Sequence, residues 1–121
     1  MNELILVFWR HVRSYYVKNG RPTDEQAGIR SALRFVRRLY GSTPAREFGP
    51  MKLKAVRQAM MEADLSRGVI NQYVGRVRRM FRWGVENELI RVDVYQALLA
   101  VMMAGFARQL GPRLVTAWWP P

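Results

Sequence analysis

Residues 66–85, SRGVINQYVGRVRRMFRWGV, combine a regular apolar stripe with five arginines. The stripe recurs at helical spacing and consists of Ile70, Val74, Val77 and Phe81. The opposite face carries Gln72, Arg76, Arg79 and Trp83. The stretch contains no acidic residue, although a face that serves only solubility usually mixes charges, because like charges on neighbouring turns repel. The segment therefore predicts a core helix whose outer face meets an acidic partner.

The whole chain is strongly basic, and its positive charge comes mainly from arginine. The 121 residues include 20 Lys+Arg against 9 Asp+Glu, which gives a formal net charge of +11, and 17 of the cationic residues are arginine. A guanidinium group presents a planar fork of donors that suits phosphates and guanine edges. Nucleic acid is therefore the leading partner class. An anionic membrane fits less well, because the basic residues are not confined to one amphipathic segment.

The residue inventory argues against catalysis and against a bound cofactor. Cysteine is absent, which excludes disulfides, thiol chemistry and cysteine metal sites. His11 is the only histidine, so a histidine metal cluster is excluded, and no nucleophile–base pair can be assembled. The apolar run at residues 4–9 is too short for a membrane span, and Glu3 precedes it where a signal peptide is basic. We expect a non-enzymatic, cytoplasmic protein without cofactor, metal, small-molecule substrate or membrane contact.

Helix signals recur along the chain, whereas strand signals are poor. The first helix is expected over residues 2–18, where Asn19-Gly20 ends it. The second helix starts at Thr23, after a proline, and Thr23 with Gln26 indicates a capping box. Gly41 is expected to end this second helix.

Three more helices are expected in the second half of the chain. The third follows Gly49-Pro50, with proline at the favoured first position. Ser66 is expected to cap the fourth helix, the arginine-rich one, and Asn87 to end it. Asp93 with Gln96 forms a second cap-like pair that opens a shorter apolar helix.

The expected organisation is all-α, a compact bundle of four to five helices joined by short connections. Residues 1–104 are expected to form this one domain. The segment 105–121, GFARQLGPRLVTAWWPP, is interrupted by glycine and proline and is expected to be an atypical, loosely ordered tail.

Several residues around the fourth helix follow the spacing of a family pattern: Leu65-Ser66, Val69-Ile70-Asn71, Val74, Val77-Arg78, Phe81, Trp83-Gly84, Leu89-Ile90 and Ala97-Leu98. The pattern resembles the amino-terminal core-binding domain of the tyrosine recombinases, or phage integrases, and covers about residues 4–101. That domain is a SAM-like bundle of four or five helices. The sequence departs from the pattern at Gly68-Val69, where the family often has a threonine, and at Val92-Asp93, where Asn-Pro is common.

The resemblance implies sequence-preferring binding of double-stranded DNA, in the service of DNA integration and recombination. In the family, the second and fourth helices of this domain cross the major groove, and a carboxy-terminal domain holds the catalytic arginines, lysine, histidines and tyrosine. Those residues have no counterpart here, because no histidine follows His11 and no tyrosine follows Tyr95. The chain is therefore expected to be an excised fragment or a shortened gene product, non-catalytic by itself.

The resemblance also implies a homo-oligomer that assembles on DNA, since the first and last helices of the family's domain contact neighbouring protomers. The apolar residues of the expected last helix, Leu98, Leu99, Met102 and Met103, are compatible with such contacts. Simple packing of that helix onto the bundle is the alternative, because most apolar helix faces serve the core.

Nine residues are the candidates for DNA contact. Base-edge contacts are expected from Gln26, Arg30, Gln72, Tyr73 and Arg76. Phosphate contacts are expected from Arg34, Arg38, Arg67 and Arg79. Each assignment has a structural alternative: the arginines form a solvated face, and Tyr73 belongs to the core at the border of the apolar stripe. His11 is expected to be a core histidine rather than a catalytic one.

Two other classes of function remain open beside the recombinase module. One is a stand-alone helical DNA-binding regulator, which differs from a recombinase in the arrangement of its target sites. The other is a SAM-like protein-interaction module whose positive charge serves an acidic protein partner.

Overall fold

Five α-helices and one short hairpin build the part of the chain that the computed structural model describes, which is residues 1–110, with side chains described to Val101. The helices are α1 (Asn2–Tyr15), α2 (Asp24–Tyr40), α3 (Pro50–Glu62), α4 (Arg67–Glu86) and α5 (Val92–Leu110). The hairpin pairs β1 (Val17–Lys18) with β2 (Arg21–Pro22), and a 3₁₀ turn, Ala45–Glu47, precedes α3. The expected all-α class and the helical bundle are confirmed.

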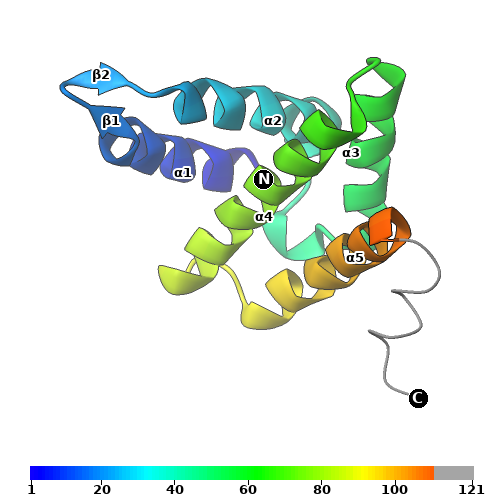
Figure 1. The fold of residues 1–121 in the computed structure, drawn as a ribbon. Helices are drawn as coiled ribbons and strands as arrows, with labels where there is room; N and C mark the ends of the chain where they lie inside the picture. Colours follow the sequence, from blue (N-terminus) through cyan, green and yellow to red (C-terminus); the bar gives the residue numbers. More distant parts are fainter. Residues whose placement is uncertain (111–121) are drawn as a thin grey trace.

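Helix α4 is the central element, because each of the other four helices packs against it. In Figure 1, α1 and α2 lie side by side with the hairpin at their far end, and α4 crosses them diagonally. The buried residues of α4 are Ile70, Val74, Val77, Met80, Phe81 and Gly84. All four positions of the predicted apolar stripe are among them, so the predicted core face is confirmed.

Aromatic rings fill the centre of the core. The Phe48 ring stacks on the Phe81 ring at a centroid distance of 5.3 Å, and Tyr40 meets Phe48 edge-on. Phe48 comes from the segment between α2 and α3, so this contact anchors that connection to α4. Aromatic pairs in such offset or edge geometries stabilise a core beyond their buried area.

The limits of α3 and α4 agree with the sequence signals. Ser66 caps α4, since its Oγ accepts a hydrogen bond from the Val69 backbone N–H at 3.2 Å. Asn87 is the residue at which α4 ends, and Pro50 opens α3 in its first turn. These residues satisfy or tolerate the unpaired backbone groups of helix ends.

The first helix is shorter than expected, and a hairpin follows it. Helix α1 ends at Tyr15 rather than at residue 18, and Val17 and Lys18 pair with β2 instead. Asn19 and Gly20 have φ values of 54° and 75°, the left-handed region that a tight hairpin turn requires at both central positions. The Asn-Gly pair is therefore a signal for a hairpin turn as well as for a helix end. The hairpin was not predicted, because the other strand signals in the sequence are poor.

The expected capping box at the start of α2 does not form. Thr23 is the residue before α2, but its side chain makes no cap hydrogen bond. Its hydroxyl donates instead to the Tyr16 carbonyl at 3.1 Å, and the Gln26 amide donates to the same carbonyl at 2.7 Å. The prediction was wrong because the carbonyl at the end of α1 lies within reach of both side chains and accepts from them, whereas a capping box needs both side chains to accept from backbone N–H groups.

Helix α5 begins at Val92, so Asp93 lies in its first turn, where its carboxylate accepts from the Val94 N–H at 3.0 Å. The helix continues to Leu110, which means that the domain limit expected after residue 104 falls inside a helix. The rest of the expected tail, residues 111–121, lies outside the described residues. Among the described helices, none combines the length and apolar character needed to cross a bilayer.

Candidate nucleic-acid interface

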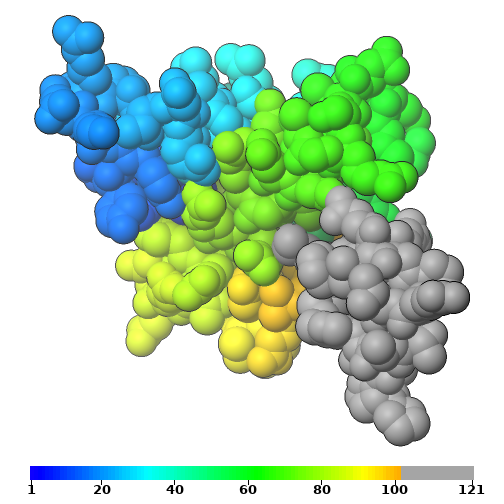
Figure 2. All heavy atoms as spheres, viewed as in Figure 1, coloured from blue at the N-terminus to red at the C-terminus, as the bar shows by residue number. Residues whose placement is uncertain are grey.

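A shallow basic concavity of about 480 Å³ lies on the outer side of α4. We call it the arginine face, and it consists of Gln72, Gly75, Arg76, Arg78, Arg79 and Arg82. These residues share one side of the helix because their spacing repeats every three or four positions. Figure 2 shows α4, in green to yellow, exposed across the middle of the molecule. No atom outside its own helix lies within 4 Å of a Cβ built on Gly75, so the floor of the concavity is open backbone.

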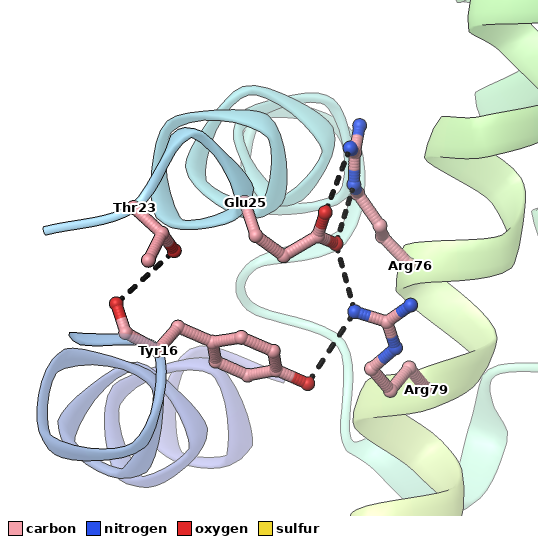
Figure 3. A network of polar contacts seen from close by, with 5 residues as sticks. All are labelled: Tyr16, Thr23, Glu25, Arg76 and Arg79. Atoms are coloured by element: carbon pink, nitrogen blue, oxygen red, sulfur yellow. Dashed lines mark hydrogen bonds and ion pairs between the residues drawn. The ribbon is translucent and has the colours of Figure 1, made fainter. Parts of the chain in front are cut away.

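One acidic side chain, Glu25 of α2, also lines this concavity. Figure 3 shows it reaching from α2 toward α4, between Arg76 and Arg79. Its Oε1 accepts from Arg76 Nε at 3.1 Å and from Arg79 NH1 at 2.8 Å, while Oε2 accepts from Arg76 NH2 at 3.3 Å. The same Arg79 nitrogen donates to the Tyr16 hydroxyl at 3.4 Å. The network joins α1, α2 and α4.

These contacts change the ionisation of Glu25. Hydrogen bonds from Arg76 lower the pKa of Glu25 below its ordinary value of 4.5, against the opposing effect of burial, and Arg79 adds to the decrease. Burial lowers the pKa of Arg79, but the hydrogen bond to Glu25 and the Tyr16 phenol outweigh this, so the net shift is upward. Both groups therefore stay charged through the neutral range.

The Arg76 guanidinium packs against Gly28 of α2. A Cβ built on Gly28 would lie 2.5 Å from the Arg76 Cζ and 2.6 Å from its Nη1, which is closer than a Cβ atom approaches non-bonded heavy atoms in proteins. With only hydrogen at this position, the guanidinium lies directly against α2, and the Arg76 side chain is only 16% exposed. Arg76 is thus part of the α2–α4 contact as much as of the surface.

Two of the residues predicted to contact bases, Gln26 and Arg76, are less exposed to solvent than expected. Gln26 is buried, with 7% of its surface exposed, and its amide is bound to the Tyr16 carbonyl. That assignment is corrected: Gln26 braces the end of α1 against α2. The Arg76 guanidinium is bound to Glu25 through Nε and Nη2 and lies against Gly28 of α2, and we therefore regard it as a positioning residue.

The other predicted residues of α4 are accessible to different degrees. Gln72 and Arg79 are exposed on the arginine face, and Arg67 is exposed at the first turn. Tyr73 is half-buried against the core, and the Arg76 guanidinium lies 5.7 Å from the centroid of its ring. The core alternative thus describes Tyr73 better than base reading does.

The predicted arginines of α2 do not line the arginine face. Arg30 and Arg34 line a separate groove between α1 and α2, together with Asn2, Ile5, Leu6, Trp9, Leu33 and Arg37. We call this the α1–α2 groove. Arg38 is exposed on α2, with its guanidinium 5.7 Å from the Phe35 ring centroid. Of the nine candidates, three line the arginine face and two line the α1–α2 groove, whereas Gln26, Arg38, Arg67 and Tyr73 line neither.

Sequence reasoning left four members of the site out of its residue set. Gly75, Arg78 and Arg82 follow from the helical spacing of Gln72 and Arg79, and a wider arc of the helix would have included them. Glu25 gave no such signal, because 51 residues separate it from Arg76 along the chain. Only the packing of α2 on α4 brings them together.

Replacing Glu25 by glutamine should destabilise the protein by about 1 kcal/mol near neutral pH, since the pair is charged but partly solvated. Because folding lowers the pKa of Glu25, its contribution is complete above its ordinary value of 4.5 and is lost as the pH falls through the lower folded value. Urea unfolding of wild type and Glu25→Gln across this range should show the two stabilities converge in acid. Glu62→Gln, at an exposed position, is the control, and a difference that stays constant with pH would contradict the pairing.

No family model matches this chain, and neither a curated protein nor a solved structure does. The resemblance to the tyrosine recombinases accordingly remains a prediction from sequence. What the described residues offer toward function is the chemistry of their surfaces.

Proposed function

We propose that this protein binds double-stranded DNA without cleaving it, as the core-binding domain of a site-specific tyrosine recombinase or integrase. The observation that supports this proposal is the arginine face, an exposed side of a 20-residue helix that carries arginines and no acid of its own before Glu86. The major groove of B-DNA is wide enough to admit an α-helix. Guanidinium groups at the flanks of such a helix neutralise phosphates, which supply most of the affinity.

The arrangement favours a division of labour within the arginine face. Arg79 and Arg82 are the phosphate contacts in this proposal, since both are exposed and extend from the outer side of α4. Gln72 is the base-edge contact, because its exposed amide offers both a donor and acceptors. Gly75 lies between them and lets the helix backbone approach the nucleic acid closely.

Duplex binding should depend strongly on salt. With about five phosphates neutralised, log K should fall with log salt at a slope near −4 to −5. Arg79→Ala should make the slope shallower by about 1, because one phosphate contact is lost. Anisotropy titrations of a labelled duplex at several salt concentrations measure this. Arg46→Ala, an exposed arginine on the 3₁₀ turn, is the matched control, and a flat salt response would remove the electrostatic basis of the proposal.

Base reading and phosphate binding should separate in two variants of the same face. Gln72→Ala should reduce the preference for a duplex selected from a randomised pool, at a cost of about 1–3 kcal/mol for a bidentate contact. Arg79→Ala should weaken selected and random duplexes alike. Equal losses from both variants on both duplexes would refute the division. Footprints of the selected sites add the distinction from a regulator, since a recombinase protects inverted half-sites around a short crossover region.

A second candidate function, binding of an acidic protein segment, is supported by the α1–α2 groove. Its floor is apolar, from Ile5, Leu6 and Trp9, and its wall carries three arginines of α2. Apolar anchors with a cationic wall suit an acidic amphipathic helix. If that is the role of this groove, Arg34→Ala should leave duplex affinity unchanged, whereas a DNA contact through α2 predicts a loss similar to that of Arg79→Ala.

A further inference from the structure

A second concavity, of about 610 Å³, lies between the carboxy-terminal halves of α1 and α4. Its aromatic and cationic lining includes His11, Tyr15, Tyr16, Arg79, Arg82 and Trp83, and the carboxylate of Glu86 also lines it. We call it the aromatic groove. Arg79 and Arg82 line both this groove and the arginine face, so the two surfaces adjoin.

Three rings of the groove form a continuous stack. The His11 ring lies between Tyr15 and Trp83, with centroid distances of 5.2 Å on both sides and interplanar angles of 26° and 27°. Trp83 closes the inner end, because its ring also packs against the buried Phe8 at 5.4 Å. Tyr15 lies at the outer end, where its ring meets Tyr16 edge-on at 4.9 Å, and it is 67% exposed. A large aromatic side chain is thus held in an ordered stack while most of its surface meets solvent.

The cationic residues of the groove retain hydrogen-bonding capacity. Among the described side chains, Arg79 uses NH1 for both of its partners, and Arg82 uses Nε for its bond to Glu86. A guanidinium has five N–H donors, so each arginine has donors left for an anion. The Arg82–Glu86 pair is more than half exposed, and such pairs are weak enough to exchange partners.

We propose that the aromatic groove binds an unpaired nucleobase of single-stranded nucleic acid. The base stacks on the outer end of the Tyr15–His11–Trp83 series, and Arg79 and Arg82 hold the neighbouring phosphates. Every base has a π-face and every nucleotide a phosphate, so ring faces beside guanidinium groups suit this ligand without sequence preference. The position of the strand beside the arginine face rests on the proposed function, but the base site itself does not.

The experiment compares two labelled strands with the full chain at one salt concentration. One is an oligothymidine of about 12 nucleotides, within the site sizes that single-strand binders cover, and the other is an abasic strand of the same length. Stacking predicts that wild type binds the base-containing strand about 5- to 100-fold more tightly. Equal affinity for the two strands would overturn the proposal.

Variants of Tyr15 separate stacking from general apolar contact. Tyr15→Phe keeps the ring and should keep the base-dependent difference, whereas Tyr15→Leu should reduce it severalfold. Val7→Ala, another exposed apolar position on α1, is the control and should change nothing. Preservation of the difference in Tyr15→Leu would overturn the proposal, and thermal melts establish that each variant is folded.

Duplex titrations on the same preparations separate this inference from the proposed function. Duplex binding with no base-dependent difference between the single strands overturns the base site and leaves the proposed function standing. Base-dependent binding of the single strand without duplex binding overturns the proposed function and leaves the base site standing. Arg79→Ala should weaken the thymidine and abasic strands by the same factor, because its role in the groove is to hold phosphate.

Discussion

The packing of four helices around α4 is the constraint on which the rest of the structure depends. Helices α1, α2, α3 and α5 all contact it, so its apolar stripe is committed to the core. The polar residues of α4 therefore occupy the narrow arc of the helix that faces away from the bundle. The arginine face and the aromatic groove share this arc and meet at Arg79 and Arg82. A single helix therefore gives the described part of the protein both its centre and a surface with four arginines.

Periodicity and helix-end residues predicted the framework well. The stripe of α4, its Ser66 cap and its end at Asn87 follow from side-chain spacing and local hydrogen bonding, which act within one helix. The hairpin after α1 was missed because Asn19-Gly20 is compatible with a helix stop and with a tight turn. Local sequence could not decide between them, since the choice depends on whether the following residues find a partner strand.

The candidate site was less predictable, because its side chains are paired across the fold. Gln26 and Arg76 are polar and lie at helix positions typical of surface residues. Nevertheless, Gln26 binds the Tyr16 carbonyl and Arg76 binds the Glu25 carboxylate. Helical spacing gives the direction in which a side chain leaves its helix but not what it meets there. Helical spacing was sufficient to predict Arg78 and Arg82, which the predicted contact set omitted. It was not sufficient to predict the partners that α1 and α2 supply.

Because Gly28 has no side chain, this position on α2 determines where the Arg76 guanidinium of α4 can lie. Glu25 pairs with Arg79 and with Arg76, and the Arg76 guanidinium lies flat against the neighbouring helix where it makes this contact. A single methyl group at residue 28 would displace that guanidinium from its place against α2, with no change in the formal net charge of the protein. The strength of the positive potential outside α4 is thus adjustable from a residue that carries no charge and lies on a different helix.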